Sequence, residues 1–218
     1  KKINEVKNRK KIPILVGGTG LYFKALTDGL SKIPKIPLKI RNQIRALQQE
    51  IGQKKFYQQL LKIDPMSVNK IKPNDTHRSL RAYEIKFYTQ KSINSYFQNT
   101  KSNFKEIDFY KIYIDFPRQD LIEKIKLRTE QMIKSGAINE VKNFIKLKVK
   151  KDKSVNKAIG INEIRQYLKN EKDLHEISEQ ISIKTRQYAK RQSTWARGNM
   201  KTWLRLKPKH LNKFLNKI

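Results

Sequence analysis

The chain has 218 residues, of which 50 are Lys or Arg and 19 are Asp or Glu, giving a formal net charge of +31 at pH 7. Such a surplus opposes compaction unless a polyanion neutralises it, so nucleic acid is the expected partner, although an A/T-rich genome would also enrich lysine. With no cysteine and three scattered histidines, the sequence predicts no disulfide, no thiolate nucleophile and no metal site within this chain.

The sequence predicts no secretory signal. It opens with the polar stretch KKINEVKNRKK, and no run approaches the ~18 apolar residues that a membrane helix needs. We therefore expect a soluble, cytoplasmic protein with no membrane partner. We also expect the protein to be a monomer. The chain begins with Lys1 rather than Met, which we interpret as a sign that a segment precedes it.

The first predicted elements are a strand, a glycine turn and a helix. Ile12–Val16 is a short apolar run, typical of a buried parallel strand. The glycines of Gly17–Gly20 turn the chain, and a helix begins at Leu21–Leu26.

A helical block follows from about Ser31. Its predicted helices are Leu38–Ile51, Lys55–Ile63, one opened by Asn74 or Asp75, and one near Ser92–Gln98. Asn99–Asn103 is a polar linker. The alternating run Tyr110–Phe116 then predicts a strand. This order suggests an α/β core interrupted by a helical insertion.

The remainder is predicted to be helical. Asp120 is expected to cap a helix that runs to about Ser135 and stops at Gly136. Further helices are expected at Ala137–Leu147, Ile164–Leu168 and Leu174–Arg197, with a loop at Asp152–Asn156.

The GGTG turn, Gly17–Gly20, is the first candidate site. A glycine turn after a parallel strand directs backbone N–H groups at a ligand, and Thr19 adds a hydroxyl there. A plain tight turn is the alternative, and it stays open. The turn is not a nucleotide-binding P-loop, because no Lys-Ser or Lys-Thr pair follows the glycines.

Arg128 falls on an apolar stripe of the helix that starts near Asp120. The stripe consists of Leu121, Ile125, Arg128 and Met132. Arginine among apolar residues is costly unless an anion meets it. Arg128 therefore either extends from the edge of the stripe to solvent, or forms a planar clamp for phosphate or carboxylate.

Two helices combine basic and aromatic residues. In the helix that starts near Asp75, we expect Leu80, Tyr83 and Phe87 to be buried, while Arg78 and Arg81 beside His77 suit a phosphate backbone or an unstacked base. In Leu174–Arg197 an apolar line is flanked by cations, as in a nucleic-acid groove. A solvated face is the alternative for both. The apolar line is Ile177, Ile181, Tyr188 and Trp195, with Arg186, Lys190, Ser193 and Arg197 opposite and Lys184 and Arg191 beside it.

Four segments together resemble one family. IPILVGGTGLYFKAL, DPMSVNKIKPNDTHRSLRAYEI, KAIG and TRQYAKRQSTWARG occur here in the order and at about the spacing found in tRNA dimethylallyltransferases, over essentially the whole chain. The resemblance implies an α/β fold, with an incomplete P-loop kinase-like core, a mostly helical insertion that binds tRNA, and C-terminal helices. The expected segments are 1–28 and 108–218 for the core and C-terminal helices, and 29–107 for the insertion.

The resemblance also implies a reaction. Family members transfer a dimethylallyl group from dimethylallyl diphosphate to the exocyclic amine of adenosine 37 in tRNA, with help from Mg²⁺. The adenine is flipped out of its stack into a channel, and the diphosphate enters from the other end. The expected partners of this chain are thus a tRNA anticodon stem-loop and dimethylallyl diphosphate.

Site residues are carried over position by position. Thr19 matches the family threonine near the target base, and Arg128 matches the arginine that contacts the diphosphate, so these two are the predicted catalytic residues. The predicted tRNA-binding residues are Thr19, Arg41, His77, Arg78, Ser79, Leu80, Arg81, Lys157, Ala158, Ile159, Gly160, Ile161, Asn162, Lys190, Arg191, Gln192, Ser193, Thr194, Trp195, Ala196 and Arg197.

The chain departs from the family in two places. Ile161 and Asn162 precede Glu163 where the family usually has Tyr-Lys, which removes an aromatic and a cation from a tRNA contact. The family's N-terminal quarter has no counterpart here. That quarter carries the G-x-T-x-x-G-K-[ST] loop, most Mg²⁺ ligands and the Asp-Ser motif whose aspartate is the general base.

The second departure leads to a prediction that this chain alone is inactive. The alternative function is a tRNA-binding remnant or one half of a split enzyme. A small P-loop kinase fragment is disfavoured by the TRQYAKRQSTWARG helix.

Overall fold

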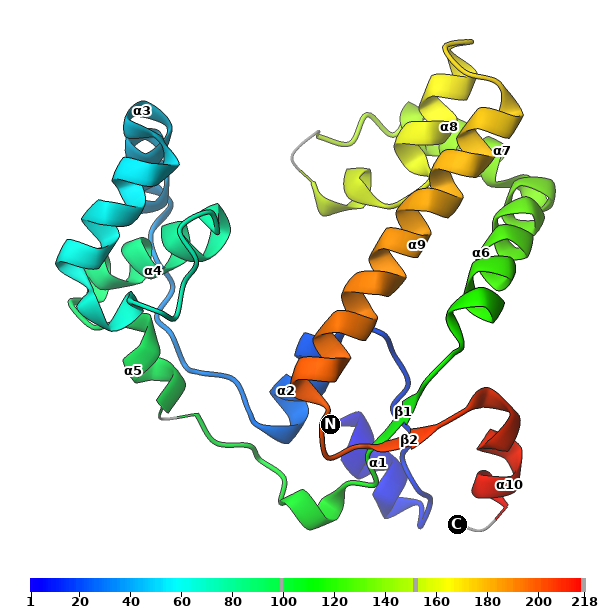
Figure 1. Ribbon diagram of the computed structural model, residues 1–218, viewed down its shortest axis with the longest axis horizontal. Coiled ribbons are helices and arrows are strands. Elements are labelled where there is room, and N and C mark those ends of the chain that lie inside the picture. The colour runs from blue at the N-terminus through cyan, green and yellow to red at the C-terminus, as the bar shows by residue number, and fades with distance from the viewer. Residues whose placement is uncertain (99, 151–152, 217–218) are drawn as a thin grey trace. The chain divides into compact units, whose positions relative to one another are not determined.

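The computed structural model describes residues 1–98, 100–150 and 153–216. Two predicted loop positions, Asn99 and Asp152, lie outside the described residues. The chain forms two compact units: Leu21–Phe109, called the helical unit below, and Lys1–Gly20 together with Tyr110–Ile218, called the sheet unit (Figure 1). The functional division predicted at 1–28, 29–107 and 108–218 stays a prediction.

The helical unit is built on two long helices. It contains most of α2 (Gly20–Thr27), α3 (Leu38–Ile63), α4 (Thr76–Thr89) and α5 (Ile93–Gln98), with 3-10 turns at Pro65–Ser67 and Glu106–Asp108. Gly52, with φ 76° and ψ 162°, interrupts α3 at the break predicted between two helices. The core of this unit consists of Ile36, Leu60, Ile71, Ala82, Ile85 and Ile93.

Two aspartates explain much of the DPMSVNKIKPNDTHRSLRAYEI segment. Asp75 caps α4 as predicted, because its Oδ1 accepts the backbone N–H of Arg78 at 3.1 Å. Asp64 is buried, and its Oδ2 accepts the hydroxyls of Ser67 and Ser92 at 2.9 Å each. Since a buried carboxylate is costly without donors, these bonds fix the end of α3 against the start of α5.

The sheet unit contains one two-stranded parallel sheet and a set of helices. Strand β1 (Ile112–Ile114) pairs with β2 (Leu204–Leu206), with Ile112 opposite Leu204. The helices are α1 (Lys2–Asn8), α6 (Arg118–Met132), α7 (Ile138–Lys146), α8 (Ile161–Leu168), α9 (Leu174–Asn199) and α10 (Leu211–Leu215), with a π-helical turn at Ile133–Ala137 and 3-10 turns at Ser154–Lys157 and Pro208–His210.

Helix α9 organises the packing of the sheet unit. It runs beside α6 in the opposite direction, and α8 packs at its N-terminal end (Figure 1). The core at that end consists of Ala137, Val141, Ile164, Ile177 and Ile181. Gly136, with φ 102°, makes the bend between α6 and α7. The helices predicted in this region and the strand predicted within Tyr110–Phe116 are confirmed.

The strand predicted at Ile12–Val16 is wrong. The segment has no regular structure, and Ile12, Ile14 and Val16 are 73%, 77% and 92% exposed. A strand exists only when a neighbour accepts its backbone hydrogen bonds. Within the described residues, β1 and β2 are the strands, and they pair with each other.

Two smaller predictions are also corrected, and one strand was missed. Helix α6 begins at Arg118 after Pro117, so Asp120 lies in its first turn and does not cap it. Phe87 is 46% exposed, because the buried face of α4 is centred on Ala82 and Ile85. Strand β2 was not predicted, because three residues show no recognisable alternation.

Candidate functional site

The GGTG turn lies directly against the C-terminal part of α9. A Cβ atom added to Gly18 would overlap the side-chain amide of Gln192, and one added to Gly20 would overlap the ring of Trp195. Gly20 is therefore needed for close approach to the helix, whereas at Gly18 the flexible end of Gln192 can move aside. Thr19, between them, is exposed. The structure thus brings Thr19 together with two predicted tRNA-binding residues of α9.

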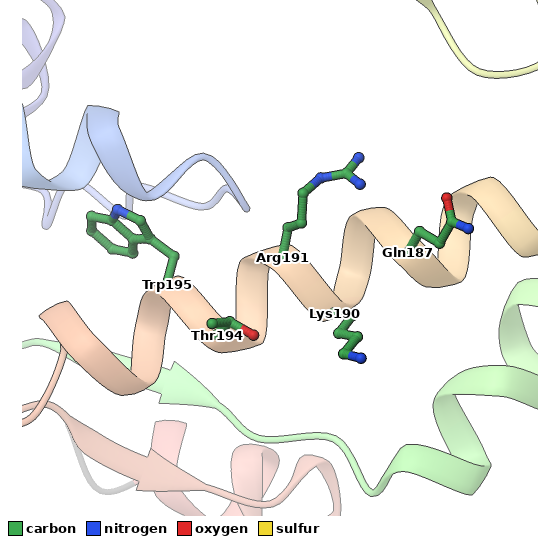
Figure 2. A pocket seen from close by; sticks show the side chains of 5 residues that line it. All are labelled: Gln187, Lys190, Arg191, Thr194 and Trp195. Atoms are coloured by element: carbon green, nitrogen blue, oxygen red, sulfur yellow. The ribbon is translucent and has the colours of Figure 1, made fainter. Parts of the chain in front are cut away.

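A hollow of about 470 Å³ lies along the same part of α9. Figure 2 shows Arg191 and Trp195 leaving one side of the helix and Lys190 leaving the other. A cation beside an aromatic ring is the combination that holds a base by its face and its phosphate by charge. The hollow is lined by Gln187, Lys190, Arg191, Thr194 and Trp195.

The apolar line predicted on α9 needs correction at Tyr188. Ile177 and Ile181 are buried, but Tyr188 is 43% exposed, and the guanidinium of Arg191 lies 5.5 Å from its ring centre. The buried face continues instead through Ala196 and Met200. Tyr188 is therefore available for stacking, and the cation above it adds positive charge to the same surface.

Arg128 is exposed on α6. The residues of α6 that are buried are Ile125 and Thr129, so Arg128 lies at the edge of the apolar stripe and is not enclosed by apolar residues. Among the described residues it has no carboxylate partner. An exposed guanidinium without a protein anion suits either solvent or a bound anion, and the diphosphate contact stays a prediction.

The Lys157–Asn162 segment forms the entry to α8. Gly160 has φ 103°, a conformation that favours glycine, and its N–H donates to Oε2 of Glu163 at 2.8 Å. Ile161 packs against the core, while Asn162 is exposed. Packing alone therefore accounts for Gly160 and Ile161, and the exposed members are the ones open to a ligand: Lys157, Ala158, Ile159 and Asn162.

Glu163 is a buried carboxylate that ties α8 to α9. It is 2% exposed and forms an ion pair with Lys184. Burial by itself raises the pKa of Glu163, but hydrogen bonds from Lys184 and from the backbone N–H groups of Glu163 and Gly160, with the charge of Lys184, outweigh it. The net pKa is therefore below the ordinary value. Lys184, predicted only as a flanking cation, has a structural partner.

In the helical unit, some of the predicted tRNA-binding residues are exposed and others are buried. His77 and Arg78 are exposed, Leu80 is half-buried, and Ser79 is fully buried, where its Oγ accepts an N–H from Gln53 at 3.3 Å. The burial of Ser79 and its hydrogen bond are therefore explained by packing within the helical unit, and its predicted contact with tRNA stays a prediction.

Arg41 and Arg81 both approach the buried carboxylate of Glu84, as does Arg45. The sequence reasoning missed Arg45 and Glu84. The spacing of Arg45, one helical turn after Arg41, is a signal that could have found it.

Neither a metal site nor a membrane helix is found in the described part of the chain. No three of its His, Asp and Glu side chains gather as the ligands of a metal ion would. Of the described helices, none combines the length and apolar character needed to cross a membrane.

Comparison with known proteins gives one family. The family model described as IPP transferase matches residues 1–199. A tRNA dimethylallyltransferase of Pelagibacter ubique is 57% identical over all 218 residues, which span 70% of its length. One from Rickettsia massiliae is 40% identical over 195 residues, 89% of this chain and 54% of the relative. The chain thus spans between about half and 70% of the length of these relatives.

Solved structures agree. A eukaryotic dimethylallyltransferase acting on tRNA matches with a TM-score of 0.71 at 27% identity, over 89% of this chain and 50% of that one. A tRNA isopentenylpyrophosphate transferase from Staphylococcus epidermidis matches with a TM-score of 0.57 at 26% identity, over 100% and 73%.

These tRNA isopentenyltransferases have a P-loop-like fold, and the chain matches them as a mostly helical protein with a small parallel sheet. The predicted fold class is therefore confirmed. Since the family model covers most of the chain and the first relative covers all of it, the chain belongs to the IPP transferase family of tRNA dimethylallyltransferases.

Proposed function

We propose that this chain carries the greater part of a tRNA dimethylallyltransferase acting on adenosine 37. In the reaction a C–O bond of dimethylallyl diphosphate breaks, a C–N bond to the exocyclic amine forms, the amine loses a proton, and diphosphate leaves. The observation that best supports the proposal is the contact of the GGTG turn with α9. It puts the exposed hydroxyl of Thr19 beside a helix surface of cations and aromatic rings.

The α9 surface is proposed to hold the nucleic acid. Lys190, Arg191 and Arg197 are exposed and suit backbone phosphates. Trp195 and Tyr188 offer ring faces to a base that has left its stack. Thr19 would hydrogen-bond the flipped adenine and so orient its amine toward the electrophilic carbon.

Arg128 is proposed to bind the diphosphate. Charge accumulates on the leaving group as the C–O bond breaks, and a planar guanidinium can donate two parallel N–H groups to it. The exposure of Arg128 and the absence of a carboxylate partner among the described residues leave it free for that contact. Removal of the amine proton is not assigned to any residue of this chain.

The rest of the diphosphate site is proposed to come from a segment of the family type. No glycine of the sequence is followed by Lys-Ser or Lys-Thr, so residues 1–218 contain no phosphate-binding loop of that kind. The Mg²⁺ dependence, the anticodon stem-loop as the bound part of tRNA, and the monomeric state are parts of the same proposal.

The test is turnover by a completed protein. A family N-terminal segment that carries the G-x-T-x-x-G-K-[ST] loop would be fused to Lys1 or added in trans, with dimethylallyl diphosphate, Mg²⁺ and unmodified tRNA. Isopentenyladenosine is then quantified by mass spectrometry. We expect product only when both parts are present, and a strong reduction in Thr19→Ala. Product from residues 1–218 alone would contradict the proposal that the rest of the diphosphate site comes from another segment. Tight tRNA binding by the completed protein without product would indicate a binding protein.

A further inference from the structure

A buried glutamate in the helical unit faces three arginines. Glu84 of α4 is 3% exposed, yet its carboxylate lies 3.5 Å from Nη1 of Arg81, 3.7 Å from Nε of Arg41 and 3.9 Å from Nε of Arg45. Arg41 and Arg45 come from α3 and Arg81 from α4. One carboxylate therefore gathers guanidinium groups from two helices, and these four residues are called the Glu84 cluster below.

The charges of the Glu84 cluster do not balance. Three cations meet one anion, so two positive charges remain, and the three arginine side chains are 37%, 51% and 40% exposed, in the order Arg41, Arg45, Arg81. Nε of Arg41 is buried and has no hydrogen-bond acceptor among the described residues. Each guanidinium carries five N–H donors, and one carboxylate shared at these distances leaves most of them unused.

We propose that Glu84 is a positioning residue that arranges Arg41, Arg45 and Arg81 as one binding site for the phosphate backbone of tRNA, with Arg45 as a contact residue. Three guanidinium groups that lie close together repel one another. The buried carboxylate of Glu84 offsets that repulsion without reaching the surface. An RNA backbone presents adjacent phosphates, each able to accept two parallel N–H groups. The identity of the polyanion rests on the proposed function.

The variant Glu84→Gln distinguishes a positioning role from a purely structural ion pair, because the two roles predict opposite changes in tRNA affinity. Glu84→Gln keeps the shape of the side chain and removes one negative charge. If the cluster only joins α3 to α4, a folded variant has a more positive surface, and its affinity for tRNA stays the same or rises. If Glu84 positions the arginines, the affinity falls although the net charge has become more positive.

The experiment measures binding of the full 218-residue chain to a labelled anticodon stem-loop across a series of salt concentrations. We expect Glu84→Gln to bind about fivefold more weakly, with a salt slope smaller by about 0.7–0.9 for each phosphate that the variant no longer binds. The matched control is Glu50→Gln on α3, where Glu50 is exposed and has no ion pair with another described residue. It should bind as well as the parent or better. A folded Glu84→Gln that binds as Glu50→Gln does would overturn the proposal.

Arg45→Ala decides the matter if Glu84→Gln fails to fold, because half of the Arg45 side chain is exposed. The variant should keep the helical circular dichroism of the parent. Its binding should show a salt slope that is smaller by the contribution of one bound phosphate. The control Lys62→Ala, near the other end of α3, should reduce the slope less. Unchanged binding by Arg45→Ala would refute the cluster. A parent chain that does not prefer the anticodon stem-loop to an unrelated hairpin contradicts the proposed function instead.

Discussion

At the scale of single residues, the atoms around each glycine determine how much a substitution there changes stability. Gly18 and Gly20 both approach α9, but their neighbours differ: Gln192 offers the flexible end of a side chain, whereas Trp195 offers a rigid ring. Gly198, near the end of α9, has nothing within 4 Å of its added Cβ. The same substitution at these three positions should therefore have three different effects.

Gly20→Ala should destabilise the chain by about 1–3 kcal/mol, because the Trp195 ring must move. Gly18→Ala should cost less, because Gln192 can change rotamer, and Gly198→Ala should stabilise by about 0.5–1 kcal/mol as alanine replaces glycine in a helix. Urea unfolding of the three variants measures the differences. Equal effects at Gly18 and Gly20 would mean that Trp195 is not held against the turn.

Glu163 gives a prediction about pH. Because its pKa is lowered in the folded chain, the ion pair with Lys184 adds stability that is present above the ordinary glutamate pKa of about 4.3 and is lost as the pH falls through the folded value. Glu163→Gln should cost about 1–3 kcal/mol at pH 7. The difference from the parent should shrink below about pH 4.

Unfolding curves at pH 7 and at acid pH test this. Glu171→Gln serves as the control, since Glu171 is exposed and its ion pair with Lys169 is on the surface; its effect should be small at both pH values. A cost at Glu163 that does not change with pH would point to the altered hydrogen-bond geometry rather than to the charge.

At the scale of elements, α6 and α9 present different functional faces. Helix α6 buries Ile125 and Thr129 and leaves Arg128 exposed, while α9 buries one face and displays Tyr188, Lys190 and Arg191. Each helix thus packs one side against its neighbours, and the proposed ligand contacts lie on the exposed side. Substitutions on the exposed sides should separate binding from folding.

Arg128→Ala, in a protein completed with the family loop segment, should reduce use of dimethylallyl diphosphate by about 10²-fold or more. Binding of tRNA should change little, because the proposed contact is with the leaving group. Steady-state kinetics in each substrate and a separate tRNA-binding assay give the two readouts, with Lys126→Ala on the same helix as the control. Loss of tRNA binding, or unfolding of the variant, would contradict the assignment.

At the scale of the whole molecule, the surplus of positive charge should dominate tRNA affinity. The net charge is +31, and exposed cations predicted to meet tRNA occur in both units: Arg78 in one, Lys190 and Arg197 in the other. Release of counterions from tRNA then makes binding steeply dependent on salt.

The logarithm of the affinity should fall linearly with the logarithm of the salt concentration, with a slope whose size is about 0.7–0.9 per bound phosphate. An anticodon stem-loop with adenosine at position 37 should bind more tightly than an unrelated hairpin at every salt concentration. Fluorescence anisotropy over a salt titration provides both measurements. A flat dependence would show that the lysine excess reflects composition and not function.

Local chemistry was readable from the sequence alone. The cap at Asp75, the break at Gly52 and the long basic helix were predicted because each depends on a few neighbouring residues, namely a short acceptor, a missing side chain or a 3.6-residue period. The family motifs likewise predicted tRNA contacts at Thr19 and at Lys190–Arg197 of α9, since motif order is a property of the chain itself, and these contacts stay predictions.

Tertiary structure decided what depends on distant partners. Ile12–Val16 has the composition of a strand, but a strand needs a neighbour, and the neighbour is not encoded in the run itself; β1 and β2 form because residues far apart in sequence meet. The exposure of Tyr188 and Phe87 followed from which face each helix turns toward its core. The Glu84 cluster is of the same kind. A buried glutamate among three arginines could be seen only once α3 and α4 were packed together, because burial, unlike charge, is set by what covers the residue.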